Sequence, residues 1–133
     1  MIGPQEQIVH ERHLSHVATR RIVLLGGHQP SIAIDLYVAD ERRGRLLIAR
    51  DDSLVVERAI SAARSGVCSD AGEWSYAAYV VVVRSSYDAD DGSPTVTLTR
   101  ANGDRRPLVI ELGADEIDAL SESLDWLEGQ AAA

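Results

Sequence analysis

The chain has 133 residues, of which 45% are hydrophobic and 26% are charged. This composition is typical of one soluble globular domain, and it excludes a chain too polar to collapse. No apolar run approaches the roughly 18 residues that a membrane-spanning helix needs, and the start shows no signal-peptide pattern. The single cysteine, Cys68, excludes an internal disulfide and favours a reducing compartment. We therefore expect a cytoplasmic protein with a single core.

The charge balance points to a class of partner. All 13 basic residues are arginine, and they stand against 21 acids, which gives a formal net charge of -8. A field of that sign repels the phosphates of nucleic acid and attracts basic molecules. The absence of lysine is consistent with genome bias, which we favour, or with a high-salt host. The charge therefore predicts a protein partner, and a basic one, rather than DNA.

The first third of the chain is predicted to be β-rich. Residues 1–18 have no clean period and are predicted to form an N-terminal arm, a short helix or an edge strand. A short β-rich run at residues 22–25 is stopped by two glycines. Residues 31–39 then alternate apolar and polar side chains, which predicts a half-buried strand. After a predicted polar turn at residues 40–44, residues 45–50 return as the second strand of a hairpin.

The middle of the chain changes its hydrophobic period from two to 3.6. Capping residues at 51–53 are followed by an apolar stripe and then by Gly66, which predicts an amphipathic helix of three or four turns. Beyond a polar loop, residues 74–84 are apolar on both alternating faces. That pattern is typical of a central strand that is covered on both sides.

The last third predicts another hairpin and a second helix. Residues 95–100 alternate, residues 101–104 contain the Asn-Gly hairpin signal, and residues 108–112 return. From Ala114 an apolar stripe with acids in the first turn predicts a helix that ends at Gly129.

These elements predict an α+β fold in the order β-β-β-α-β-β-β-α. We expect a mostly antiparallel sheet of about six strands with two amphipathic helices packed on it. Residues 1–18 are assigned to the arm, residues 19–129 to a single domain and residues 130–133 to a disordered tail. The two halves also suggest a ββα pseudo-repeat, because each consists of strands followed by one helix that ends at a glycine.

None of the polar clusters matches a catalytic or metal-binding motif. His10, Glu11, His13 and His16 resemble the zinc motif H-E-x-x-H, but the second histidine comes one residue early. The acidic turn at residues 88–92 lacks acids at the first and third positions of a calcium loop when Gly92 takes the sixth. Cys68 lacks the second glycine of a nucleophile elbow. We therefore predict no catalytic residue, no metal and no cofactor.

The apolar segment at residues 74–84 is the best candidate for an interaction face. Two predicted helices can lie on the same side of the sheet, and the other side then needs the N-terminal arm or a partner to cover it. We therefore expect a homodimer, or the binding of another protein, through the candidate interaction face formed by Trp74, Tyr76, Tyr79, Val81 and Val83.

Three classes of function remain open from the sequence. The first is a small acidic, non-enzymatic module that binds another protein, in the manner of an immunity, adaptor or inhibitor protein. The second is a single-stranded nucleic-acid-binding protein, because strands followed by a helix are similar in outline to the Whirly and positive-cofactor-4 groups. Under that hypothesis the nucleic-acid face would consist of Tyr37, Tyr79, Arg84 and Arg100. The third is an enzyme without a recognisable motif.

Overall fold

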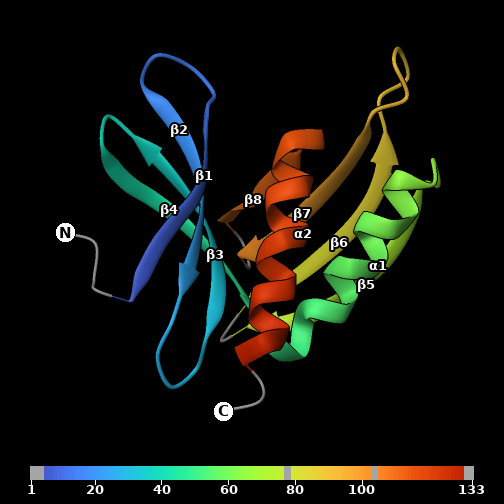
Figure 1. Cartoon of the computed structure of the whole chain (residues 1–133). Helices are drawn as coiled ribbons and strands as arrows, with labels where there is room; N and C mark the ends of the chain where they lie inside the picture. Colours follow the sequence, from blue (N-terminus) through green and yellow to red (C-terminus); the bar gives the residue numbers. More distant parts are fainter. Residues whose placement is uncertain (1–4, 77–78, 103–104, 131–133) are drawn as a thin grey trace. The chain divides into compact units, whose positions relative to one another are not determined.

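A computed structural model of the chain describes residues 5–76, 79–102 and 105–130 (Figure 1). These residues form eight strands, two α-helices and one short 3-10 turn. In chain order the elements are β1 (Glu6–His13), β2 (Ala18–Leu25), β3 (Ser31–Val38), β4 (Glu41–Ala49), the 3-10 turn (Arg50–Asp52), α1 (Ser53–Arg64), β5 (Ser69–Tyr76), β6 (Tyr79–Tyr87), β7 (Pro94–Asn102), β8 (Arg105–Leu112) and α2 (Ala114–Gly129).

The fold is α+β, and the predicted order of strands, helix, strands and helix is confirmed. The prediction of about six strands in one sheet is wrong, because the strands form two antiparallel sheets of four, ordered β1-β2-β3-β4 and β5-β6-β7-β8. One additional strand is β1, which lies within the predicted arm and is the edge strand of the first sheet. Both sheets are simple meanders, in which each strand pairs with the next one along the chain.

The segment at residues 74–84 is not one central strand, as the sequence suggested. Strand β5 ends at Tyr76 and β6 begins at Tyr79, and the two pair antiparallel with Trp74 opposite Val81. The connection at residues 77–78 lies outside the described residues. Two alanines give no turn signal of the kind that glycine, proline or asparagine gives. A continuous apolar run therefore concealed a hairpin.

The predicted polar turn at residues 40–44 is also shorter than expected. Ala39 and Asp40 alone make the turn, with φ angles of 51° and 64°, and β4 begins at Glu41. Positive φ at both central residues is the geometry of the two-residue turn that best matches strand twist. The polar residues 41–43 are exposed strand residues at the turn end of the hairpin. The later Asn-Gly signal lies partly outside the described residues, but the strands on either side of it do pair antiparallel.

The chain divides into two compact units. The first unit consists of β1–β4 and most of α2, and its described residues are 5–51 and 119–130. The second unit, residues 52–118, consists of α1, β5–β8 and the first turn of α2. Each unit thus holds a four-stranded meander with a helix. The assignment of residues 19–129 to one domain stays a prediction.

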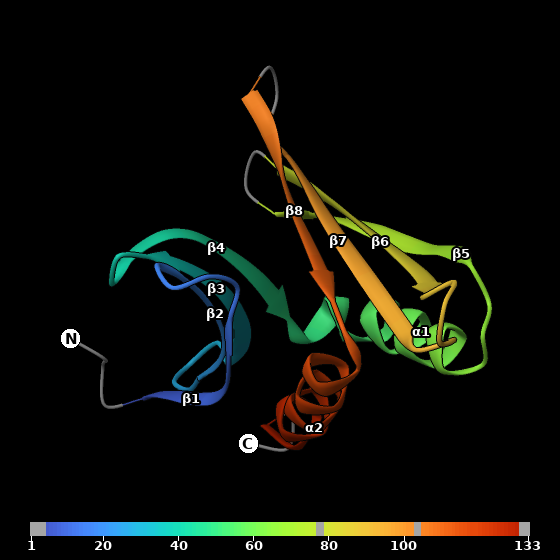
Figure 2. The same ribbon diagram turned by 90° about the horizontal axis from the view of Figure 1, so that it is seen from above.

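In the first unit one face of the sheet is apolar, and the other, the charged face, carries ion pairs beside the buried Val23 and Ala33. The apolar face comes from alternate residues of β2, β3 and β4, which the strand register aligns in rows, such as Leu24, Ile32 and Ile48. All three side chains are buried. Figure 2 shows that the sheet is strongly curved. Glu6 and Arg45, which come from the two edge strands, lie 3.8 Å apart, and this approach across four strands places the charged residues on the concave side.

In the second unit α1 packs on β5, β6 and β7. The predicted amphipathic helix is confirmed, with Val56, Ala59, Ile60 and Ala63 buried on one stripe, and it ends before Gly66, whose φ is +72°. Asp52 occupies the N-cap position, although its side chain makes no capping hydrogen bond. Val81, Val83, Val96 and Leu98 lie on the same face of the sheet and are buried. Of the described residues, none belongs to a helix both long and apolar enough to cross a membrane.

Candidate interaction site

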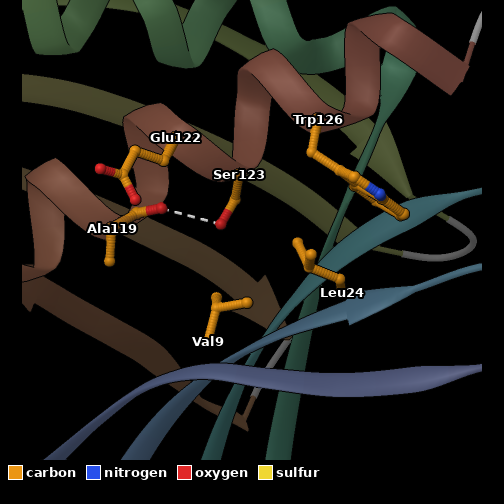
Figure 3. Close-up of a pocket in the computed structure, with 6 residues that line it drawn as sticks. All are labelled: Val9, Leu24, Ala119, Glu122, Ser123 and Trp126. Carbon is orange, nitrogen blue, oxygen red and sulfur yellow. Dashed lines mark hydrogen bonds between the residues drawn. The ribbon is translucent and has the colours of Figure 1, made fainter.

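The first unit contains a small cavity between α2 and the strands β1 and β2 (Figure 3). Its volume is about 190 Å³. The walls are mostly apolar, and the polar lining comes from one face of α2. The lining residues are Val9, Leu24, Ala119, Glu122, Ser123 and Trp126.

Helix α2 supplies part of the apolar wall of the cavity, through Ala119 and Trp126, and the one acid that lines it, Glu122. Leu120, Leu124 and Leu127 are buried at helical spacing, which anchors the helix in the first unit. At the start of the helix, the Glu116 carboxylate accepts a hydrogen bond from the backbone N–H of Gly113, which is half of a capping box. The acids in the first turn agree with the sequence prediction.

The exposed side of α2 is acidic to its end. Glu122, Asp125 and Glu128 are exposed, and the helix contains no basic residue in its last turn. Acids near a helix C-terminus face the negative end of the macrodipole, which costs roughly 0.3–1 kcal/mol for each charge. In the described part of the chain, none of these three carboxylates takes part in an ion pair. The helix thus keeps acids where folding alone would favour bases.

On the charged face of the first unit's sheet, by contrast, the acids are paired with arginines. The Asp35 side chain is only 1% exposed, and its two carboxylate oxygens accept hydrogen bonds from Nε and Nη2 of Arg45 at 2.7 and 2.8 Å. Glu6, from the far edge strand, lies 3.8 Å from the Arg45 guanidinium. The hydrogen bonds to Asp35 raise the pKa of Arg45 against the effect of desolvation, and the charges of Asp35 and Glu6 add to the rise. The ion pair is therefore satisfied from within the unit.

A second arginine on this face is also held by its own chain. Arg21 donates a hydrogen bond from Nε to Glu11 at 2.8 Å and lies over the Tyr37 ring, 4.3 Å from its centroid. Desolvation lowers the pKa of Arg21, but the hydrogen bond and charge of Glu11, with a contribution from Tyr37, raise it above its ordinary value. The sequence predicted that Asp35 and Tyr37 lie on the polar face of a half-buried strand, but it did not predict that the Asp35 side chain is buried.

The structure does not gather the predicted interaction face on the surface. Trp74, Val81 and Val83 are buried in the second unit, and the Trp74 Nε1 has no hydrogen-bond partner. Tyr79 is half-buried, with the Arg100 guanidinium 4.7 Å from its ring centroid. The side chain of Tyr76 lies outside the described residues. The other face of this sheet is the open one, with Val80 38% and Val109 57% exposed.

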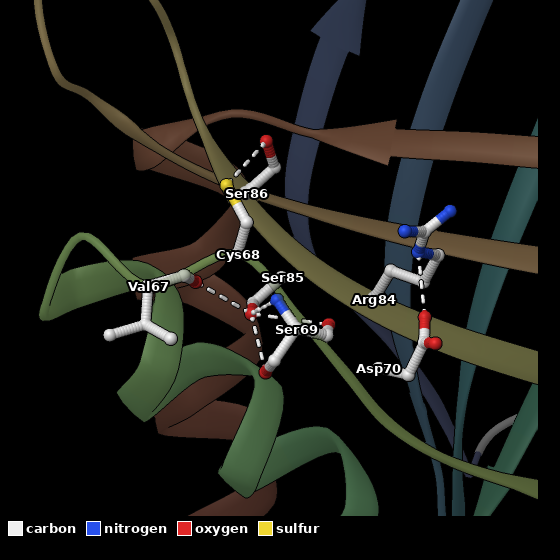
Figure 4. A network of polar contacts seen from close by, with 7 residues as sticks. All are labelled: Val67, Cys68, Ser69, Asp70, Arg84, Ser85 and Ser86. Carbon is white, nitrogen blue, oxygen red and sulfur yellow. Dashed lines mark hydrogen bonds and ion pairs between the residues drawn. The ribbon is translucent and has the colours of Figure 1, made fainter.

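The residues of the alternative nucleic-acid face are also separated. Tyr79 and Arg100 contact each other, whereas Arg84 lies on the opposite face of the sheet and pairs with Asp70 at 2.7 Å (Figure 4). Tyr37 belongs to the first unit and stacks with Arg21. Both tyrosines are thus already in contact with an arginine of the same unit.

The histidine cluster lies on a hairpin rather than a helix. His10 and His13 belong to β1, and His13 contacts Thr19 and Glu11. His16 follows in the connection to β2. Within the described ranges, no three side chains of histidine, cysteine, aspartate or glutamate come together in a way that could hold a metal ion.

The remaining polar network of the second unit holds strands together. The buried Ser85 hydroxyl donates to the carbonyl of Val67 at 2.8 Å and accepts from the Ser69 N–H at 3.1 Å (Figure 4). Cys68 is exposed, and its Sγ lies 3.6 Å from the Ser86 hydroxyl, a group that cannot act as a general base. This network fixes the start of β5 against β6.

Sequence reasoning missed Glu122 and Trp126 as site residues. It recognised the apolar stripe of α2 and the acids in its first turn, but it gave no role to the acids further along the helix. One signal was present, since α2 contains six acids and no base, including acids where the dipole disfavours them. No known protein family matches the chain, and no curated protein or solved structure shows significant similarity to it.

Proposed function

We propose that the protein is a non-enzymatic interaction module that binds a basic segment of another protein. The observation on which this proposal rests is the exposed side of α2 in the first unit, which carries the unpaired acids Glu122, Asp125 and Glu128, and Glu122 lines an apolar cavity. The net charge of -8 strengthens the attraction for a basic partner and repels nucleic acid.

The contrast between the two kinds of charge in this unit supports the proposal. The Asp35 carboxylate already has an arginine, and so does the Glu11 carboxylate. The three acids of α2 have none among the described residues. Of these acids, Glu122 lies at the edge of the apolar cavity. An apolar centre with polar and charged residues at its edge is typical of protein-binding sites.

The open face of the β5–β8 sheet favours self-association as a second activity. Val80 and Val109 are exposed there, together with the half-buried Val82 and Thr99. The homodimer predicted from the sequence is therefore retained as a proposal, but on the opposite face from Val81 and Val83. Because each copy has a charge of -8, self-association should strengthen as salt screens the repulsion.

The proposed binding function is tested by capture from a lysate of the native host. The bait is the wild-type chain or the variant Glu122→Gln/Asp125→Asn/Glu128→Gln. A matched control, Asp40→Asn/Asp51→Asn/Glu73→Gln, removes the same charge from exposed acids elsewhere. We expect a basic protein that binds the wild type and the control, elutes at about 1 M salt, and is lost with the α2 variant.

Two outcomes would contradict the proposal. One is capture that the α2 variant retains in full. The other is salt-sensitive, micromolar binding of a single-stranded DNA oligonucleotide in a fluorescence-anisotropy titration, which would favour the nucleic-acid hypothesis. At physiological salt we expect no change in anisotropy.

A further inference from the structure

We propose that the cavity beside α2 receives an arginine side chain of the basic partner, with its guanidinium on Glu122. This inference rests on the proposed function and assigns the chemistry of the recognised group. The cavity presents apolar walls, formed by Val9, Leu24 and Trp126, and an acid at one end. In Figure 3, Glu122 and Trp126 stand at opposite ends of the lining residues.

The polar groups of the cavity define the complementary ligand. The Ser123 hydroxyl already donates its hydrogen to the carbonyl of Ala119 at 2.8 Å, as Figure 3 shows. The carboxylate of Glu122 offers hydrogen-bond acceptors and a negative charge. Because ion pairs among the described residues leave Glu122 without a cation, its best partner is a positively charged donor from outside.

An arginine fits these features better than a lysine or a free cation. Its aliphatic stem can lie on the apolar wall while the head remains at the acidic end. The planar guanidinium pairs with a carboxylate through two parallel hydrogen bonds and is more weakly hydrated than an ammonium. The first unit already uses this chemistry, because Arg45 donates two hydrogen bonds to Asp35. A volume of about 190 Å³ gives room for one such side chain, not for a folded segment.

The probe for this site is the peptide acetyl-Gly-Arg-Gly-amide, titrated into the full chain and followed by NMR. The indole N–H signal of Trp126 is the reporter, and the variant Trp126→Phe identifies it against that of Trp74. The matched peptides contain lysine or citrulline in place of arginine; citrulline has almost the same shape without the charge. We expect the Trp126 signal to shift with a dissociation constant on the order of 1 mM, and the citrulline peptide to bind at least about fivefold more weakly.

Two variants separate the charge from the cavity. Glu122→Gln removes only the charge and should raise the dissociation constant of the arginine peptide about three- to fivefold. Ala119→Leu keeps every charge but fills the cavity, and it should abolish the shift of the Trp126 signal. Glu73→Gln, an exposed acid in the second unit, is the matched control and should leave binding unchanged.

Equal binding of the arginine and citrulline peptides, or equal binding of the lysine peptide, would overturn the assignment of arginine. A shift that persists in Ala119→Leu would overturn the cavity as its site. These results are distinguishable from failure of the proposed function. If the proposed function fails, capture from the lysate does not depend on the α2 acids, whether or not the arginine peptide binds.

Discussion

The two units are built from the same parts and differ in what they do with the open face of the sheet. Each has a four-stranded meander with a helix on one face. In the first unit the other face is concave and holds Asp35 and Arg45 as a buried, doubly hydrogen-bonded pair. In the second unit the other face holds exposed valines and an Arg84–Asp70 pair whose side chains are 68% and 74% exposed.

This difference shows that alternation along a strand defines a face but not its environment. Asp35 and Arg84 each lie on the face of their sheet that is opposite to the buried apolar row. Curvature of the first sheet brings Glu6 and Arg45, from its two edge strands, to within 3.8 Å of each other and removes Asp35 from water. The same kind of ion pair therefore has a structural role in one unit and little energetic weight in the other.

The largest expected effect separates the core face of the second sheet from its open face. Val81→Asp places a carboxylate at a position that is 1% exposed and should unfold the protein, at a cost of about 4–5 kcal/mol or more. Val109→Asp, at a position that is 57% exposed, should leave the fold intact and weaken self-association. Circular dichroism and sedimentation measure the two effects. A folded Val81→Asp protein would contradict the assignment of the faces.

The next comparison is between the two ion pairs. Arg45→Met leaves the buried Asp35 carboxylate without its partner and should lower the free energy of unfolding by about 3–5 kcal/mol. The matched variant Arg84→Met removes an exposed partner of Asp70 and should change it by about 0–1 kcal/mol. Urea denaturation of both variants gives the comparison. An equal loss in the free energy of unfolding for the two variants would mean that the curvature of the first sheet does not isolate Asp35 from water.

A smaller effect tests the contact of α1 with β5. Gly72 has a φ of +144°, and a Cβ there would lie 3.1 Å from Cγ1 of Val55. Gly72→Ala should therefore destabilise the second unit by about 2–3 kcal/mol, through backbone strain and the close contact together. Gly92 has a φ of +74° with no atom within 4 Å of the added Cβ, so Gly92→Ala should cost only about 1 kcal/mol. If the two variants lose the same stability, the close packing of α1 on Gly72 is refuted.

The sequence was informative about element type and weak on pairing. The strand at residues 31–38 and both helices follow from hydrophobic period, and Gly66 ends α1 as predicted. The hairpin after Tyr76 was missed because residues 76–83 are all apolar or aromatic and include no glycine, proline or asparagine. The burial of Asp35 depends on sheet curvature and on Arg45, ten residues away, and neither leaves a local signal. The cavity was missed because Val9 and Trp126 come from opposite ends of the chain.

The central claim is that the acids at the end of α2 serve binding rather than folding. Its most direct test is urea denaturation of Glu122→Gln/Asp125→Asn/Glu128→Gln, measured on the same preparation that fails to capture the partner. Neutral residues remove the unfavourable interaction of Asp125 and Glu128 with the helix dipole, so the free energy of unfolding should stay equal or rise by about 0.3–1 kcal/mol. A loss of more than about 1 kcal/mol would show that these acids stabilise the fold and would contradict the claim.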